Sequence, residues 1–358
     1  MVNPAINHES SDTWNEIISQ PSVWQQVLQD PAVNSRMDSI LETSAKRTKW
    51  IFVGCGTSYY LAEAAANTAM SLTGKPARAL PGSEVLLYPE LVRAEGENVQ
   101  AVVISRSGKT SEAVRAAITL RQQLGIPTIG ITCAEHSPLQ QACEQTIVLR
   151  MADEKSTVMT RSFTSMLIAL QVLSAKRADN LKFISDLQSM AMHFGSLLDG
   201  IAGQMESFVK KQPFHDYVFL GQGAFHGIAR EAALKVMEMS CSYSQFFHAL
   251  EFRHGPKAIV SPDTCLTFYL SQTGYKAEAE VLREMKELGG VIVTICNRAT
   301  EEVIRCSDLL IELNHPAHEL ALLAANIVPS QLMGLFTGMR KGLNPDSPKN
   351  LTRVVMLD

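Results

Sequence analysis

Residues 50–59 read WIFVGCGTSY, and residues 217–226 read YVFLGQGAFH. Each segment starts with a run of large apolar residues, passes through two glycines separated by one residue, and leads into a helix-forming stretch. An apolar run that enters a glycine turn and then a helix is typical of the strand–turn–helix unit of a parallel α/β sheet. The sequence therefore predicts two such units, in different halves of the chain.

Further apolar runs follow each of these segments in the same order. The first strand ends, at Val53 and Leu220, differ by 167 positions, and the next, at Ile104 and Leu270, differ by 166. Such a constant offset indicates an internal duplication. We predict an α/β fold with two tandem lobes, each a parallel sheet flanked by helices. The predicted strands lie at residues 50–54, 101–105, 127–132, 146–150, 217–221, 266–271, 290–296 and 308–313.

The chain has 358 residues, more than one hydrophobic core usually organises, so two domains are expected. Apolar residues at helical spacing, without a strand pattern, predict a connecting helix between the lobes. The predicted organisation is an N-terminal helical segment (1–47), a first lobe (48–179), the connecting helix (180–212), a second lobe (213–340) and a C-terminal tail (341–358).

The composition indicates a globular protein that binds small molecules. Hydrophobic residues make up 46% and charged residues 19%, which argues against disorder. The net charge is −4 and no stretch concentrates basic residues, so no nucleic-acid partner is expected. The longest uncharged run, 320–339, has Asn326, Pro329, Ser330 and Gln331 at its middle, which favours a buried helix over a membrane span.

The seven cysteines include no C-x-x-C pair, which fits neither a zinc site nor a disulfide scaffold. The N-terminus MVNPAINHESSDTW lacks the pattern of a secretory signal. We therefore expect a reducing, cytoplasmic location. Residues 315–319 offer three possible metal ligands, but the proline among them disfavours a regular helix, and no metal is expected.

The turn from Gly54 to Ser58 would present backbone N–H groups to an anion at the start of a helix. It lacks the third glycine of a dinucleotide fingerprint and the Gly-Lys-Ser/Thr ending of a nucleotide P-loop. No cofactor is therefore expected. Read alone, the turn could equally serve only to pack the helix on the sheet.

The strand 101–105 ends in a loop that carries hydroxyl groups at Ser105, Ser107 and Thr110. Hydroxyls and amides at the start of a helix suit a phosphate monoester. Helix capping by a serine is the alternative, but it accounts for one hydroxyl and not for three. The corresponding loop of the second half, 271–276, has fewer hydroxyls, so we expect one lobe to bind and the other to support it.

In the second half, Lys235 is spaced i, i+4 from Glu231 and i, i+3 from Glu238. Spacing alone favours an exposed ion pair. The segment FRHGPK at 252–257 changes this interpretation, because it places a titratable histidine, His254, at a rigid break sixteen residues beyond Glu238. Glu238 and His254 could then form an acid/base pair.

Several motifs recur along the chain at positions typical of one known family: TWNEIISQPSVWQQVL, VGCGTSYY, SRSGKT, STVMTRSFTSM, AREAALKVMEMS, FRHGPKAIV and PDSPKNLTRVV. Through these motifs the chain resembles the double SIS (sugar isomerase) family nearly end to end. It is similar to the isomerase half of glucosamine-6-phosphate synthase, and closer to the galactosamine-6-phosphate deaminase and tagatose-6-phosphate isomerase group. The resemblance implies flavodoxin-like, three-layer αβα lobes.

The resemblance also implies roles for particular residues. Glu238 would be the base that moves a proton between C1 and C2 of a sugar 6-phosphate, and Lys235 beside it is a further candidate catalytic residue. His254 would assist ring opening from a neighbouring subunit, which implies a homodimer. Phosphate contacts are implied for Thr57, Ser58, Ser105, Ser107 and Thr110, with Arg106 beside them and the backbone near Thr157 closing the pocket.

Two departures from the synthase point away from amino-sugar synthesis. Arg353 stands where the synthase has a lysine able to form a Schiff base, and arginine stays protonated. The chain also begins without a glutaminase domain, so we expect no glutamine-dependent synthesis. The predicted function is an isomerase/deaminase that converts an amino-sugar 6-phosphate into a ketose 6-phosphate and ammonia.

Two alternatives to this function stay open. A deglycase that cleaves a phosphorylated fructosamine needs the same proton transfer but a larger pocket. A sugar-phosphate sensor would bind without turnover, although a pure binding protein has no need of the acid/base pair.

Overall fold

The computed structural model describes residues 11–357, so the expectation about a secretory signal lies mostly outside the described residues. The chain divides into two compact units. Unit 1 comprises the residues up to Pro21, Lys155–Thr160 and Ser189–Leu351. Unit 2 comprises Ser22–Glu154, Arg161–Gln188 and the residues from Thr352 onward. The lobe boundaries derived from the sequence stay predictions.

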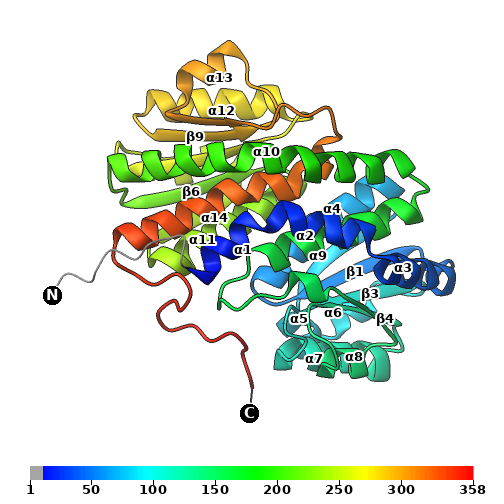
Figure 1. The fold of residues 1–358 in the computed structure, drawn as a ribbon. Coiled ribbons are helices and arrows are strands. Elements are labelled where there is room, and N and C mark those ends of the chain that lie inside the picture. The colour runs from blue at the N-terminus through cyan, green and yellow to red at the C-terminus, as the bar shows by residue number, and fades with distance from the viewer. Residues whose placement is uncertain (1–10, 358) are drawn as a thin grey trace. The chain divides into compact units, whose positions relative to one another are not determined.

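Unit 2 contains a parallel five-stranded sheet in the order β2-β1-β3-β4-β5. Its three layers can be followed in Figure 1, where α7 and α8 lie on one side of the strands and α4 and α9 on the other. The strands are β1 (Lys49–Gly54), β2 (Ala77–Pro81), β3 (Val99–Ile104), β4 (Thr128–Thr132) and β5 (Gln145–Val148). The helices are α2 (Gln20–Gln29), α3 (Pro31–Ser44), α4 (Thr57–Thr73), α5 (Gly82–Leu87), α6 (Glu90–Arg93), α7 (Ser111–Ile118), η2 (Thr119–Gln123), α8 (Pro138–Ala142), η3 (Arg150–Ala152) and α9 (Arg161–Arg177).

Unit 1 contains a second parallel five-stranded sheet, in the order β10-β9-β8-β6-β7. Figure 1 shows α12 and α13 on one side of these strands and α11 and α14 on the other. The strands are β6 (Asp216–Gly221), β7 (Tyr243–His248), β8 (Thr264–Leu270), β9 (Val291–Cys296) and β10 (Leu309–Glu312). The helices are α1 (Asp12–Ile18), α10 (Leu181–Lys211), α11 (Ala224–Ser240), η4 (Glu251–Arg253), η5 (Pro256–Ile259), α12 (Tyr275–Glu287), α13 (Glu301–Cys306), η6 (Glu319–Leu322) and α14 (Leu323–Arg340).

The two sheets have the same topology, which confirms the predicted fold class and is what an internal duplication would produce. Read from the opposite edge, the order in unit 1 becomes β7-β6-β8-β9-β10, and this matches β2-β1-β3-β4-β5 strand for strand. The eight predicted strands are all present. The sequence analysis missed β2 and β7, because their sequences, ARALP and YSQFFH, carry no continuous apolar run.

The two glycine turns have nearly the same geometry. A Cβ atom on Gly54 would lie 2.3 Å from the backbone of Ser58, and one on Gly221 would lie 2.4 Å from the carbonyl oxygen of Phe225. The next glycine along adopts φ 54° in Gly56 and φ 53° in Gly223, a region that L side chains rarely adopt. Both turns therefore require glycine, and both bring the first turn of a helix against the end of a strand.

Helix α14 is buried along almost its whole length, as the sequence predicted for the uncharged run. In the part of the chain that the structure describes, Glu319–Arg340 alone is long and apolar enough to cross a membrane. Its most apolar stretch of 18 residues is 100% buried inside the protein. Two glycines let α14 pack closely on α11. A Cβ on Gly334 would lie 2.9 Å from the carbonyl oxygen of Lys235, and one on Gly338 would lie 2.2 Å from that of Met239.

The loop after β8, in unit 1, is filled by carboxylates from the protein itself. Glu278, on α12, accepts hydrogen bonds from the amide of Ser271 at 2.7 Å and from its hydroxyl at 2.9 Å. Glu319 accepts from the amide of Gln272, from the amide of Thr273 at 3.2 Å and from the Thr273 hydroxyl. Burial, followed by the charge of Glu319, outweighs the Ser271 hydrogen bonds and raises the pKa of Glu278 to about 7.

The raised pKa of Glu278 makes this loop sensitive to pH. Because the pKa in the folded state is higher than in the unfolded state, stability is greatest below the unfolded pKa near 4.5 and is lost as pH rises through about 7. We expect Glu278→Gln to reduce the loss of unfolding free energy between pH 5 and pH 8 by on the order of 3 kcal/mol. Urea unfolding at both pH values measures this difference.

The matched control is Glu280→Gln, which removes a carboxylate from the exposed side of the same helix. It should leave the pH dependence as in the unmodified protein. An equal pH dependence in Glu278→Gln and the unmodified protein would contradict the assignment of this titration to Glu278.

Candidate functional site

The hydroxyl-rich loop of unit 2 joins β3 to α7. Ser105 is buried, and its Oγ lies 3.5 Å from Oγ1 of Thr110, the residue that precedes α7. The Thr110 side chain makes no capping hydrogen bond to the helix. Helix capping, the alternative interpretation of this loop, therefore does not account for the Thr110 hydroxyl. Ser107 Oγ accepts a hydrogen bond from the amide of Lys109 at 3.2 Å, so it faces its own loop.

Gly108 fixes the shape of this loop. It adopts φ +60°, and a Cβ there would lie 2.3 Å from Oγ of Ser137. Its amide donates to the carbonyl of Ser105 at 3.1 Å, and its carbonyl accepts from the amide of Leu139 at 2.9 Å. The loop is thus held against the start of α8, and its hydroxyls are positioned before any ligand arrives.

The two duplicated loops differ in what satisfies their donors. Thr273 of unit 1 donates to Glu319, whereas its counterpart 166 positions earlier is Ser107. Among the described residues, no carboxylate accepts a hydrogen bond from Ser105, Ser107 or Thr110. The loop of unit 2 therefore offers hydrogen-bond donors to an anion from outside the protein. The donors of the loop in unit 1 already bind two carboxylates of the protein itself, Glu278 and Glu319.

Arg106 belongs to this loop, but its charge is compensated inside unit 2. The residue is 4% exposed and its guanidinium lies 3.3 Å from a carboxylate oxygen of Glu154, which is also buried. Glu154 in turn accepts a hydrogen bond from Ser162. Arg106 therefore holds the loop in place, and it does not present an unpaired positive charge.

The C-terminal tail lies against the same loop and helix in unit 2. The carbonyl oxygen of Arg353 accepts a hydrogen bond from Arg106 at 3.4 Å, and its guanidinium pairs with Asp153 at 2.8 Å. The amide of Ser111, the first residue of α7, donates to the carbonyl of Val355 at 3.2 Å. The Arg353 side chain is 40% exposed, so its charge is shared between Asp153 and solvent.

Thr57 and Ser58 begin α4, directly after the glycine turn, and both are buried. They follow β1, which pairs in parallel with β3. They therefore lie, like the loop 105–110, at the carboxyl ends of the strands. The structure therefore brings five of the predicted phosphate contacts to one edge of one sheet. Thr157 belongs to unit 1, where its amide donates to the carbonyl of Asp346 at 3.2 Å.

Helix α11 of unit 1 carries a buried charge cluster of Glu231, Lys235 and Glu238. The Lys235 side chain is 0% exposed, its Nζ lies 3.3 Å from Glu231, and it donates a hydrogen bond to Glu238. The exposed ion pair that spacing alone favoured is thus wrong, because α14 covers this face of α11. Glu238 is the member that reaches solvent, with a side chain 18% exposed.

The two carboxylates determine the protonation state of Lys235. Burial alone lowers the pKa of this amine, but the charges of Glu231 and Glu238 outweigh burial and raise it above its usual value. Lys235 is therefore a fixed positive charge that orients the Glu238 carboxylate.

His254 lies in the turn between η4 and η5, and its side chain is exposed. Its amide donates to the carbonyl of Glu251 at 3.0 Å, and Gly255 follows with φ 126°. Within the described residues the imidazole makes no hydrogen bond or ion pair, including none with Glu238. The predicted acid/base pair therefore stays a prediction.

Three further histidines, at 226, 315 and 318, have contacts of their own. His226 stacks on His248 with ring centroids 3.7 Å apart. His315 Nε2 lies 3.0 Å from Ser189 Oγ, and His318 Nδ1 accepts from the amide of Leu320 at 3.2 Å. No cluster of three or more metal-binding side chains occurs in residues 11–357.

Sequence reasoning missed several acidic residues around these sites. Glu154 gives no signal, because the adjacent acidic residues Asp153 and Glu154, followed by Lys155, look like a solvated charged segment. Glu278 and Glu319 were also missed, although the offset of 166 places Glu278 opposite Glu112 and could have drawn attention to it.

Comparison with known proteins finds relatives of similar architecture. A glutamine–fructose-6-phosphate aminotransferase [isomerizing] of Pyrobaculum aerophilum is 27% identical over 86% of this chain and 51% of its own length. A tagatose-6-phosphate ketose/aldose isomerase structure from Escherichia coli has a TM-score of 0.86 at 22% identity, covering 100% of this chain and 99% of that one. A glucosamine-6-phosphate deaminase structure from Thermotoga maritima has a TM-score of 0.76 at 26% identity, covering 97% and 100%.

The chain spans between 51% and 58% of the length of the first curated relatives it matches. The profile of the SIS domain matches residues 44–176 and 215–336, which together make up most of the chain and correspond to the two duplicated sheets. The chain therefore belongs to the SIS domain family.

Proposed function

We propose that the protein is a sugar-phosphate isomerase that converts glucosamine or galactosamine 6-phosphate into a ketose 6-phosphate and ammonia. The observation that carries this proposal is the partly exposed Glu238 carboxylate, held by a fully buried Lys235. A buried lysine flanked by two carboxylates costs desolvation energy, and such a cost is typical of a functional site. Support comes from the similarity to the Escherichia coli tagatose-6-phosphate ketose/aldose isomerase and to the Thermotoga maritima glucosamine-6-phosphate deaminase.

In this proposal the loop 105–110 binds the phosphate. Its hydroxyls and the start of α7 would donate to the phosphate oxygens, with Thr57 and Ser58 at the same sheet edge. The contrast with the loop of unit 1, where Glu278 and Glu319 accept the corresponding hydrogen bonds, supports an anionic ligand here.

Glu238 would act as the base on the opened sugar. It takes the proton from C2, which gives an enolamine, and returns a proton to C1, which gives an imine at C2. Water adds to the imine carbon and ammonia leaves, so the product is a ketose 6-phosphate. Lys235 keeps the carboxylate oriented throughout and takes no part in the proton transfer.

His254 would open the sugar ring from a neighbouring subunit. Its exposed side chain, without a partner among the described residues, supports a role outside its own chain. The proposal therefore includes a homodimer. It also includes a cytoplasmic location, in keeping with the free cysteines of the chain.

A panel of substrates tests the reaction itself. Glucosamine, galactosamine, glucose and tagatose 6-phosphates and a fructosamine 6-phosphate are each scored for ammonia and for ketose. Equal amounts of ammonia and ketose from an amino-sugar 6-phosphate are expected. Turnover only of the fructosamine would instead identify a deglycase, and tight binding without any turnover would identify a sensor.

The phosphate loop is tested by Ser107→Ala. Removing one hydrogen bond to a charged group costs about 1–2 kcal/mol, so we expect KM to rise about tenfold with little change in kcat. Thr273→Ala is the matched control, because this residue stands at the duplicated position but donates to Glu319. An unchanged KM for Ser107→Ala would remove this loop from the substrate site.

The proton transfer is tested by Glu238→Gln, which keeps the size of the side chain and removes its basicity. We expect kcat to fall at least about 10²-fold while binding of the sugar phosphate is retained. In deuterated water the unmodified protein should place deuterium at C1 of the ketose. Turnover of Glu238→Gln at the original rate would contradict the mechanism.

Mixed dimers test whether His254 acts across the interface. Glu238→Gln and His254→Ala are each expected to be nearly inactive alone. If each site combines Glu238 of one subunit with His254 of the other, a mixed dimer has one intact site. Equal mixing with subunit exchange should then recover about a quarter of the original activity. No recovery in a mixture shown to contain mixed dimers would place both residues in one subunit or exclude His254.

A further inference from the structure

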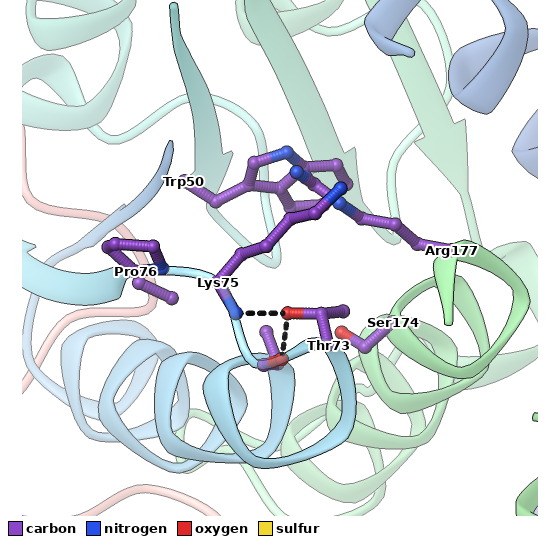
Figure 2. A pocket seen from close by; sticks show the side chains of 8 residues that line it. Trp50, Thr73, Lys75, Pro76, Ser174 and Arg177 are labelled. Atoms are coloured by element: carbon purple, nitrogen blue, oxygen red, sulfur yellow. Dashed lines mark hydrogen bonds between the residues drawn. The ribbon is translucent and has the colours of Figure 1, made fainter. Parts of the chain in front are cut away.

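A small pocket lies in unit 2 at the start of β1, the end of that strand opposite to the glycine turn. Figure 2 shows Lys75 and Arg177 approaching the Trp50 indole from different elements. Lys75 follows the end of α4, and Arg177 is the last residue of α9. The pocket is lined by Trp50, Ala69, Thr73, Lys75, Pro76, Ala77, Ser174 and Arg177.

A second hollow adjoins this pocket and shares its two cations. It is lined by Leu41, Ser44, Ala45, Lys75, Lys176 and Arg177. Lys176 pairs with Asp38 at 2.7 Å, so its charge is compensated. Neither set of lining residues includes an acidic side chain. Together the two hollows form a basic depression with an apolar wall at Leu41 and Ala45.

The two shared cations have no acidic partner in the described part of the chain. Arg177 donates a hydrogen bond to the carbonyl of Arg47, and its guanidinium lies 4.3 Å from the centre of the Trp50 ring. Lys75 makes no ion pair. Burial lowers the pKa of Arg177 to about 10, and no carboxylate offsets this effect. A half-buried guanidinium without a counter-charge is unusual, since buried charges are normally paired.

Helix ends supply part of the missing negative charge, but not all of it. Both α4 and α9 end at this pocket, and a helix C-terminus is equivalent to about half a negative charge. Two helix ends therefore offset about one of the two positive charges, and the effect is screened where Lys75 is exposed. About one positive charge remains beside a pocket and a buried indole Nε1 that has no hydrogen-bond partner in residues 11–357.

We propose that Lys75 and Arg177 bind a phosphate group, free or as an ester, in the larger hollow of this basic depression. The guanidinium fork and the ammonium would bind different oxygens of one phosphate, and Trp50 holds the guanidinium plane in position. An ester would direct its organic part toward Leu41 and Ala45. The site is separate from the loop 105–110, because that loop follows the carboxyl end of β3 whereas Trp50 lies near the amino end of β1.

The test is calorimetric titration of the Ser107→Ala protein, in which binding at the hydroxyl loop is weakened. Inorganic phosphate and phenyl phosphate are the probes, with chloride at equal ionic strength as the reference. We expect saturable binding of phosphate that Lys75→Gln weakens about tenfold. Lys46→Gln, an exposed lysine that lines neither hollow, is the control and should bind as before.

The two probes distinguish the two sources of the phosphate. Tighter binding of phenyl phosphate, reduced by Leu41→Ser, identifies an ester, and equal binding identifies the free ion. Arg177→Gln should abolish binding, but it could also disturb folding, so the exposed Lys75 decides the outcome. No saturable binding in the Ser107→Ala protein, or equal binding with Lys75→Gln, would overturn the proposal.

Discussion

The absence of space for a Cβ atom at two strand ends is the constraint on which the rest of the structure depends. At Gly54 and at Gly221, the backbone of the following helix lies where a side chain would begin. Any larger residue would push α4 or α11 away from its sheet. The close approach sets the first turn of each helix at the carboxyl end of a parallel strand, where backbone donors and helix dipoles favour anions. Thr57 and Ser58, the first residues of α4, inherit their position from this contact.

The two halves of the chain share a sheet topology, but different groups accept the hydrogen bonds of the two corresponding loops. In unit 1, Glu278 and Glu319 bind the amides and hydroxyls of the loop after β8, as an internal substitute for an anion. In unit 2, no carboxylate among the described residues accepts from the hydroxyls of the loop after β3, and Glu154 forms a buried ion pair with Arg106 instead. One loop is therefore closed to an external anion and the other is available to one. Two carboxylates, Glu278 and Glu319, make this difference in unit 1, although unit 2 also has a carboxylate, Glu112, at the position that corresponds to Glu278.

The sequence predicted most of the fold, because buried parallel strands appear as continuous apolar runs and the glycine turns recur at a constant offset. It did not predict β2 and β7, whose sequences carry no such run. The sequence also did not predict that Lys235 is buried. Spacing of i, i+4 is the same on an exposed and a buried face, and here Gly334 and Gly338, about a hundred residues away, let α14 cover it. The hydroxyl loop was predictable because its chemistry is local.

The charge cluster on α11 also limits which group can change its protonation during turnover. Two carboxyl groups and one ammonium share a largely buried setting. The carboxylates raise the pKa of Lys235, so this lysine stays protonated across the physiological range. Glu231 is fully buried and cannot meet a ligand, whereas Glu238 reaches solvent. In the proposed mechanism, Glu238 is therefore the member of the cluster that exchanges a proton with the substrate.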